Sequence, residues 1–328
     1  MGRRDETKLR KHEWSLDERD HDLLIALLEH KVLTTEQIKI LFFCSLRRCQ
    51  HRVKELKDLG LIGSFAPRRN FGEGRPPDCL YLTKLGRSVC AEAKGVRASD
   101  LPWIPDEGYQ ESQNLAHRVG VNAFFCALIE ASRTREGHCL ATWRPEHWVR
   151  TKSAEVKPDG FGRYMHPGGA SQFYVEYDRG TEAFGALTAK LAGYLRLAAG
   201  WTKEGDLTRF PNLLFIGPEG VREGEVGSAF RHAIQRLHVR TPLATSFPLY
   251  VASEDRLSRC GVLGPVWRHA ATDSDRVSLL DLPAQPADLY RTTRCLGRYF
   301  TDADANRWRR IAPVSAPPRF SVQPRLPP

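Results

Sequence analysis

Several features that define other protein classes are missing from this sequence of 328 residues. No apolar run approaches the roughly 20 residues that span a bilayer, and the opening MGRRDETKLRKHEW has no signal-peptide core. The eight cysteines are scattered without a C-x-x-C pair, which argues against a zinc site or a disulfide framework. There is no internal repeat and no G-x-x-x-x-G-K-[ST] phosphate loop. We therefore expect a cytoplasmic protein that is neither membrane-spanning nor a P-loop ATPase.

The charge is unbalanced toward the basic side. Lys and Arg number 49 against 39 Asp and Glu, which leaves a formal net charge of +10. A cationic protein of this kind is expected to bind a polyanion, and nucleic acid fits better than a membrane surface because no apolar anchor accompanies the charge. The length predicts about two domains, each with enough chain for its own core.

The first domain is predicted over residues 14–95, after a charged mobile arm at 1–13. Apolar residues at helical spacing predict helices at about 16–30 and 45–59, with a short helix opening at Thr34 and Thr35 between them. Gln37 is placed for a capping box with Thr34. Strands are expected at 61–65 and 79–83, followed by a helix at 84–94. Three helices and a two-stranded wing are typical of a winged helix-turn-helix.

The third of these helices has the composition of a DNA recognition helix. Across residues 45–57 it carries five Lys or Arg and one acid, and its apolar side chains at Cys49, Val53 and Leu56 are expected to face inward. The outward cations can then reach guanine edges or phosphates in a major groove, and the basic wing can contact the backbone. The alternatives are a plainly solvated helix face, or a winged helix used for protein contact, as in a homodimer. The predicted DNA-binding residues are Arg47, Arg48, His51, Arg52, Lys54, Arg68, Arg69 and Arg75.

A Pro-, Gly- and acid-rich linker is expected at 96–110, and a second, α/β domain with a mixed sheet at 111–255. It should begin with a helix at about 111–133 and contain the buried strands NLLFIG at 212–217 and PLYVAS at 248–253. A C-terminal extension at 256–311 interleaves aromatic residues with arginine, which suits either nucleic acid or a peripheral helix. The last segment, 312–328, is a Pro-rich tail that we expect to be disordered.

The centre of the second domain is a strand–hairpin–strand–helix pattern from Val156 to Tyr194 that gathers charged residues. Glu176 and Asp178, two apart on one strand, project from one side of it, and pairing through 166–170 brings Asp159 beside them. Lys190 lies on the apolar stripe of the next helix and needs a charged partner there. Such acids could hold Mg²⁺ as Asp159, Glu176 and Asp178, with Lys190 on a phosphate. The alternative is a buried ion-pair network that only stabilises the fold.

The sequence also resembles a known family. Asp159 in KPDG, Glu176 in VEYD and the strand–strand–helix order resemble the core of PD-(D/E)xK nucleases, which have a restriction-endonuclease-like fold. The wider pattern, KPDG…FYVEYDRGTE behind a winged helix, resembles the replication-relaxation family of actinobacterial plasmids and integrative elements over roughly residues 15–255. One departure stands out: such nucleases have Lys two residues after the Glu, and this chain has Asp178 there. Lys190 could reach the same point from the helix.

The resemblance implies a DNA-binding protein acting in replication or mobilisation of a mobile element, alongside other replication or mobilisation proteins. It implies catalytic roles for Asp159, Glu176, Asp178 and Lys190, with Mg²⁺ as cofactor. It also implies a site role for His117, for which the alternative is a hydrogen-bonded core histidine. Whether the chain is an endonuclease stays open, because a winged-helix regulator or adaptor whose nuclease-like domain recruits partners would carry the same pattern.

Overall fold

The computed structural model describes residues 16–66, 77–102, 104–105, 114–149, 156–201, 207, 210–218, 220–239, 245–272 and 274–284. The predicted mobile arm, the wing arginines Arg68, Arg69 and Arg75, and the Pro-rich tail lie outside them. The chain divides into two compact units between Cys126 and Ala127, inside the long helix α6 (Asn114–Ser132). Within the described residues, no helix combines the length and apolar character needed to cross a bilayer.

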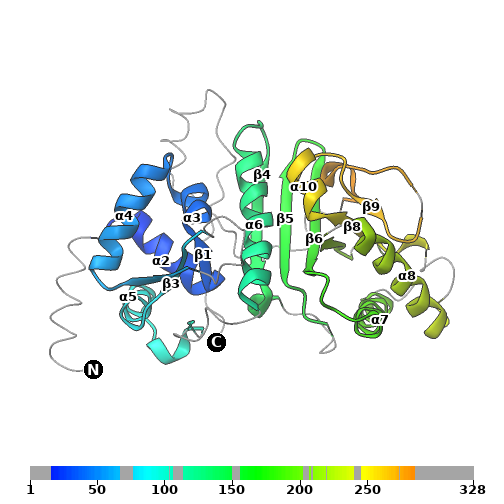
Figure 1. Ribbon diagram of the computed structural model, residues 1–328, viewed down its shortest axis with the longest axis horizontal. Coiled ribbons are helices and arrows are strands. Elements are labelled where there is room, and N and C mark those ends of the chain that lie inside the picture. The colour runs from blue at the N-terminus through cyan, green and yellow to red at the C-terminus, as the bar shows by residue number, and fades with distance from the viewer. Residues whose placement is uncertain are drawn as a thin grey trace. The chain divides into compact units, whose positions relative to one another are not determined.

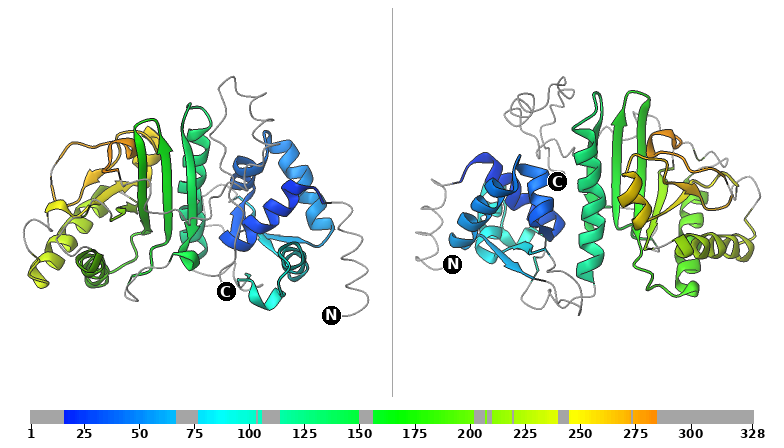
Figure 2. Two further views of the ribbon diagram at one scale, coloured as in Figure 1. Left: turned by 180° about the vertical axis from the view of Figure 1, so that it is seen from behind. Right: turned by 45° about the horizontal axis from the view of Figure 1, so that its top comes forward.

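The first unit has the element order of a winged helix (Figures 1 and 2). An antiparallel sheet of three strands, in the order β1-β3-β2, packs with the helices. The short strand β1, which the sequence patterns did not predict, pairs Leu33 with Leu80 on β3. The elements are α2 (Glu18–His30), β1 (Val32–Thr34), α3 (Thr35–Phe42), α4 (Leu46–Asp58), β2 (Ile62–Phe65), β3 (Cys79–Leu82), α5 (Lys84–Lys94) and the 3₁₀ helix η1 (Ala98–Asp100).

Polar residues at the helix starts explain where these helices begin. The predicted capping box is confirmed, because Thr34 Oγ1 accepts the Gln37 N–H at 3.2 Å and Gln37 Oε1 accepts the Thr34 N–H at 2.9 Å. Helix α2 begins two residues later than predicted, since Asp17 and Asp20 form a second capping box that satisfies its first N–H groups. Ser45 caps α4, the predicted recognition helix, by accepting the Arg48 N–H.

The second unit is a mixed α/β structure, as predicted. Its sheet runs β4-β5-β6-β7-β8-β9, with β6, β7 and β8 parallel to one another and the remaining pairs antiparallel. The elements are β4 (Cys139–Pro145), η3 (Glu146–Trp148), β5 (Gly160–His166), β6 (Gly169–Tyr177), α7 (Phe184–Trp201), β7 (Asn212–Gly217), α8 (Gly220–Arg236), β8 (Leu249–Ser253), α10 (Glu254–Cys260), β9 (Arg268–His269) and η4 (Leu279–Asp281).

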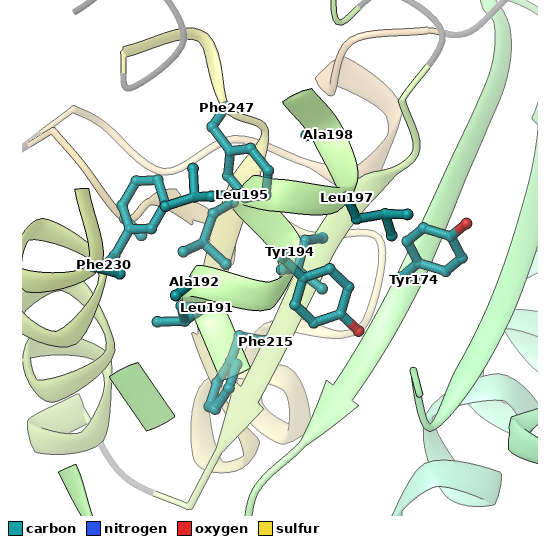
Figure 3. Packing of buried hydrophobic residues seen from close by; sticks show 14 of the residues in the cluster. Tyr174, Leu191, Ala192, Tyr194, Leu195, Leu197, Ala198, Phe215, Phe230 and Phe247 are labelled. Carbon is teal, nitrogen blue, oxygen red and sulfur yellow. The ribbon is translucent and has the colours of Figure 1, made fainter. Parts of the chain in front are cut away.

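The main core of this unit lies between the sheet and the helices α7 and α8, which run on the same side of it (Figure 1). Leu191 and Leu195 of α7 meet Phe230 of α8 and Phe215 of β7, all almost completely buried. In Figure 3 the ring of Tyr194 sits beside this cluster, with its hydroxyl pointing away from Leu195 and Phe247. Since α7 buries apolar side chains on several sides, a polar group carried on it is held in a water-poor environment.

Candidate functional site

The hairpin between β5 and β6 positions the first two site residues. Gly160 pairs with Val175 and His166 with Gly169, so the turn falls where the sequence predicted it. The same register, carried one residue further, sets Asp159 across from Glu176. Asp159 is held there by two bonds, since its N–H donates to Val175 O at 3.0 Å and its Oδ2 accepts the Tyr177 N–H at 2.8 Å. Cross-strand neighbours of this kind have Cβ atoms about 5 Å apart.

Glu176 is the buried centre of the cluster, with 2% of its surface exposed. Its Oε1 accepts the Tyr194 hydroxyl at 2.5 Å, and its Oε2 lies 3.0 Å from Lys190 Nζ. Both partners come from α7, four residues apart, and therefore from one face of that helix. The predicted partnership between Lys190 and the carboxylates is confirmed for Glu176.

Burial raises the pKa of Glu176 to about 7, and the neighbouring Asp159 carboxyl adds to the rise. Lys190 and the Tyr194 hydroxyl act in the opposite direction and keep the shift from being larger. The pKa of Lys190 is lowered by its own burial but raised more by Glu176 and Glu182, so its net shift is upward. The site thus holds a permanent cation beside a carboxyl group that changes charge near neutral pH.

A carboxylate that the sequence patterns did not single out completes the cluster. Glu182 Oε1 pairs with Lys190 Nζ, so the ammonium bridges two acids, Glu176 and Glu182. The other oxygen, Glu182 Oε2, is buried and has no hydrogen-bond partner among the described residues. Glu182 lies outside any strand and its spacing from Lys190 is eight residues, so no periodicity pointed to it. Only its place in FYVEYDRGTE, the motif that carries the family resemblance, was a signal.

Asp178, which the sequence predicted as a Mg²⁺ ligand, uses both carboxylate oxygens in hydrogen bonds within the fold. Its Oδ1 accepts the N–H groups of Gly180 at 2.9 Å and Thr181 at 3.3 Å, and its Oδ2 binds Arg222 of α8. Arg222 also donates to the backbone O of Glu182 at 2.8 Å. Both oxygens of Asp178 are therefore engaged in shaping the loop that delivers Glu182 to Lys190. This buried pair is part of the ion-pair network that the sequence left open as an alternative.

Two acids of this cluster, Asp159 and Glu176, are the candidates for holding a divalent cation. In the described ranges, no three His, Cys, Asp or Glu side chains gather closely enough to hold a metal ion. Asp159 and Glu176 are nevertheless adjacent hard-oxygen donors, and Mg²⁺ is commonly held by one or two carboxylates together with water and substrate phosphates. Both Glu176 oxygens accept hydrogen bonds, from Tyr194 and Lys190. Both Asp178 oxygens are engaged by the loop and by Arg222. Asp159, Glu176 and Asp178 therefore stay predicted Mg²⁺ ligands.

The basic helix α4 of the first unit presents the cations that the sequence predicted. Arg47, Arg48, His51 and Lys54 are exposed, while Cys49, Val53 and Leu56 are buried as expected. Glu55 is an acid beside these exposed residues, and its Oε1 lies 3.5 Å from His51 Nδ1. Such a surface suits contact with phosphates and base edges.

Arg52, the fifth predicted residue of α4, is held within the fold. It donates to both carboxylate oxygens of Asp20, which is completely buried, and to Glu55 Oε2 at 2.6 Å. These bonds tie α4 to α2 and fix the helix that carries the exposed cations. His117 lies half-buried in the part of α6 that belongs to the first unit, and its role at the carboxylates stays a prediction.

A family model described as replication-relaxation matches residues 24–213, which is more than half of the chain and includes α4, Asp159, Glu176 and Lys190. No curated protein and no solved structure matches the chain.

Proposed function

The chain belongs to the replication-relaxation family, and from this we propose that it binds DNA and acts in the replication or mobilisation of a plasmid or integrative element. The first unit would locate the DNA through the exposed face of α4. The second unit would engage a phosphodiester at Asp159, Glu176 and Lys190, and cut it with the help of Mg²⁺. Other replication or mobilisation proteins are the expected partners.

One observation carries the proposal for the second unit. The hairpin register and α7 bring two acids and one amine together at the end of β6, although they are up to 31 positions apart in the sequence. The pKa of Glu176 is raised to about 7 by burial and by Asp159. Buried charge clusters of this kind are costly to the fold, and perturbed pKa values concentrate at functional sites.

Each residue has a distinct task in the proposed reaction. Asp159 and Glu176 would hold Mg²⁺, which when bound neutralises charge on the phosphate. Lys190 would turn its ammonium from Glu182 toward the scissile phosphate and stabilise the charge that develops there. Tyr194 would keep Glu176 oriented through its hydroxyl, which lies 2.5 Å from Oε1.

The second candidate function is a regulator or adaptor that binds DNA without cutting it. Asp178 stands where the nuclease pattern has Lys and is committed to Arg222, and Lys190 is already neutralised by two acids. Under this function the cluster would serve stability and partner binding. Glu176→Gln would then leave the biological activity intact, whereas Arg48→Ala would abolish DNA binding.

Incubation of supercoiled and forked DNA with the full chain and Mg²⁺ separates the two functions. We expect nicked or cut product from the wild type and none from Asp159→Asn, because the amide keeps an oxygen for the Tyr177 N–H but loses the charge that Mg²⁺ needs. Asp275→Asn, at an exposed position of the same unit, is the matched control and should cut like the wild type. Equal product from wild type and Asp159→Asn would remove the catalytic assignment and favour the regulator.

A further inference from the structure

A second cluster of charged residues surrounds a cavity of about 160 Å³ in the second unit. The cavity lies between α8 and the turn that follows β9, and Val251 of β8 also lines it. The two walls approach so closely that a Cβ added to Gly227 would lie 2.9 Å from Ala270 O. The lining comprises Glu223, Gly224, Gly227, Arg231, Val251, Arg268, His269, Ala270, Ala271 and Thr272.

A buried carboxylate holds two arginines in place beside this cavity. Only 2% of the Glu223 side chain is exposed, and its Oε2 lies 2.5 Å from an Arg276 nitrogen and 3.4 Å from an Arg268 nitrogen. Arg276 is fixed further by donating to Val266 O at 2.7 Å. An arginine anchored in this way loses little side-chain freedom when it binds a ligand, which favours binding.

Two arginines, Arg231 and Arg268, and one carboxylate, Glu223, are among the residues that line the cavity. Glu223 Oε2 pairs with Arg268 and Arg276, and its Oε1 is buried without a hydrogen-bond partner among the described residues, whereas 31% of the Arg268 side chain is exposed. Arg231 is exposed on α8, and within the described residues its one hydrogen bond is with Ser228 Oγ at 3.1 Å. His269 adds no charge, because burial lowers its pKa and both ring nitrogens are engaged, with Phe247 O and with the Ala271 N–H.

This cavity is separate from the carboxylate cluster. Arg268 pairs with Val251, Val251 with Phe215, and Phe215 with Glu176 in one row across the sheet. Three strand spacings of about 4.8 Å put the backbones of Arg268 and Glu176 roughly 14 Å apart. Residues in one row share a face of the sheet, so both side chains belong to the side covered by α7 and α8.

We propose that the cavity is a phosphate-binding site in which Arg231 and Arg268 donate to the phosphate oxygens. Guanidinium groups match the geometry of phosphate and form strong charge-assisted hydrogen bonds with it. The phosphate belongs either to the backbone of a DNA strand or to a free nucleotide. Phosphate binding at this cavity is a function additional to the proposed cleavage, and it does not depend on that cleavage.

Binding to the full chain should be measured by calorimetry with three probes: inorganic phosphate, a nucleoside monophosphate and a short single-stranded oligonucleotide. We expect Arg231→Gln and Arg268→Gln each to weaken phosphate-probe binding about tenfold or more, as loss of a charge-assisted bond requires. Arg236→Gln is the matched control, because Arg236 is exposed on the same helix and does not line the cavity. Circular dichroism checks that each variant is folded.

The pattern over the probes identifies the source of the phosphate. Weaker binding of all three probes indicates a free nucleotide or phosphate ligand. An effect on the oligonucleotide alone, with a salt slope lower by about 0.7 for the lost contact, indicates the DNA backbone. If no probe binds, or if the Arg231 and Arg268 variants bind like Arg236→Gln, the proposal is overturned. Neither result bears on cleavage, which is read separately from Asp159→Asn.

Discussion

Glu176 is the central residue of the carboxylate cluster in the second unit. It is almost fully buried, it contacts an ammonium and a phenol, and it stands opposite a second acid across the hairpin. Burial and Asp159 favour its protonated form, while Lys190 favours the charged form. Burial and Asp159 outweigh Lys190 and raise the pKa to about 7, so the charge of the site near neutral pH depends on the state of this one carboxyl group.

We predict that Glu176 titrates with a pKa of about 7 in the folded protein. A carbon-13 NMR titration of the side-chain carboxyl measures it directly. In Lys190→Met the midpoint should move higher, because the ammonium that lowers the pKa is gone while the sulfur-containing chain keeps much of the lysine's bulk. A wild-type midpoint near 4.5, the ordinary value for Glu, would contradict the prediction.

The same shift has a consequence for stability. The folded state binds the Glu176 proton more tightly than the unfolded chain, so its favourable contribution to the free energy of unfolding is present below about pH 4.5. That contribution is lost as the pH rises through about 7.

Mg²⁺ needs the deprotonated acid, so the affinity of the proposed metal site should rise about tenfold between pH 6 and pH 8.

At the scale of elements, two ion pairs connect helices to the rest of their units. Arg222 of α8 binds Asp178 at the end of β6, and Arg52 of α4 binds Asp20 of α2. The first shapes the loop that carries Glu182, and the second fixes the helix that carries the exposed arginines. Each pair lies inside the fold, although one member of each, Asp178 and Arg52, was predicted to be a site residue.

We predict that Arg52→Ala lowers the free energy of unfolding by about 3–5 kcal/mol, because it leaves the buried Asp20 carboxylate without its cation. The double variant Asp20→Asn with Arg52→Gln should lose less than Arg52→Ala alone, since no buried charge remains. Arg48→Ala, at an exposed position of the same helix, should stay within about 0.5 kcal/mol of the wild type. Urea denaturation followed by circular dichroism gives all three values, and a loss in Arg52→Ala no larger than in Arg48→Ala would refute the structural role.

For the molecule as a whole, the net charge of +10 predicts that the proposed binding to DNA depends on salt. The predicted duplex contacts lie on α4 of the first unit, whereas the acids and Lys190 lie in the second. Variants that weaken binding and variants that abolish cutting should therefore separate into two classes.

We predict that Arg48→Gln weakens duplex binding and lowers the slope of log affinity against log salt by about 0.9, as expected for one lost phosphate contact. A change confined to certain DNA sequences, at an unchanged slope, would instead indicate contact with a base edge. Lys84→Gln, an exposed lysine at the start of α5, serves as the charge-matched control and should bind like the wild type. Fluorescence anisotropy at several salt concentrations provides both affinity and slope, and identical slopes in wild type and Arg48→Gln would count against α4 as the reading helix.

Contacts between residues close in the sequence account for the local elements, and short motifs account for the family. Helical spacing, the Thr34–Gln37 capping box and the strand alternation around Glu176 are effects of neighbouring residues, so they predicted α3, α4, β6 and the hairpin correctly. The motifs around Asp159 and Glu176 were sufficient to indicate the replication-relaxation family. Which charges meet depends on how the elements pack, because ion pairs such as Arg222 with Asp178, or Arg268 with Glu223, join residues more than forty positions apart. Periodicity does not encode such pairings, because they follow from the packing of one element on another. That packing pairs Asp178 with Arg222 and Arg52 with Asp20, and it places Glu182 beside Lys190.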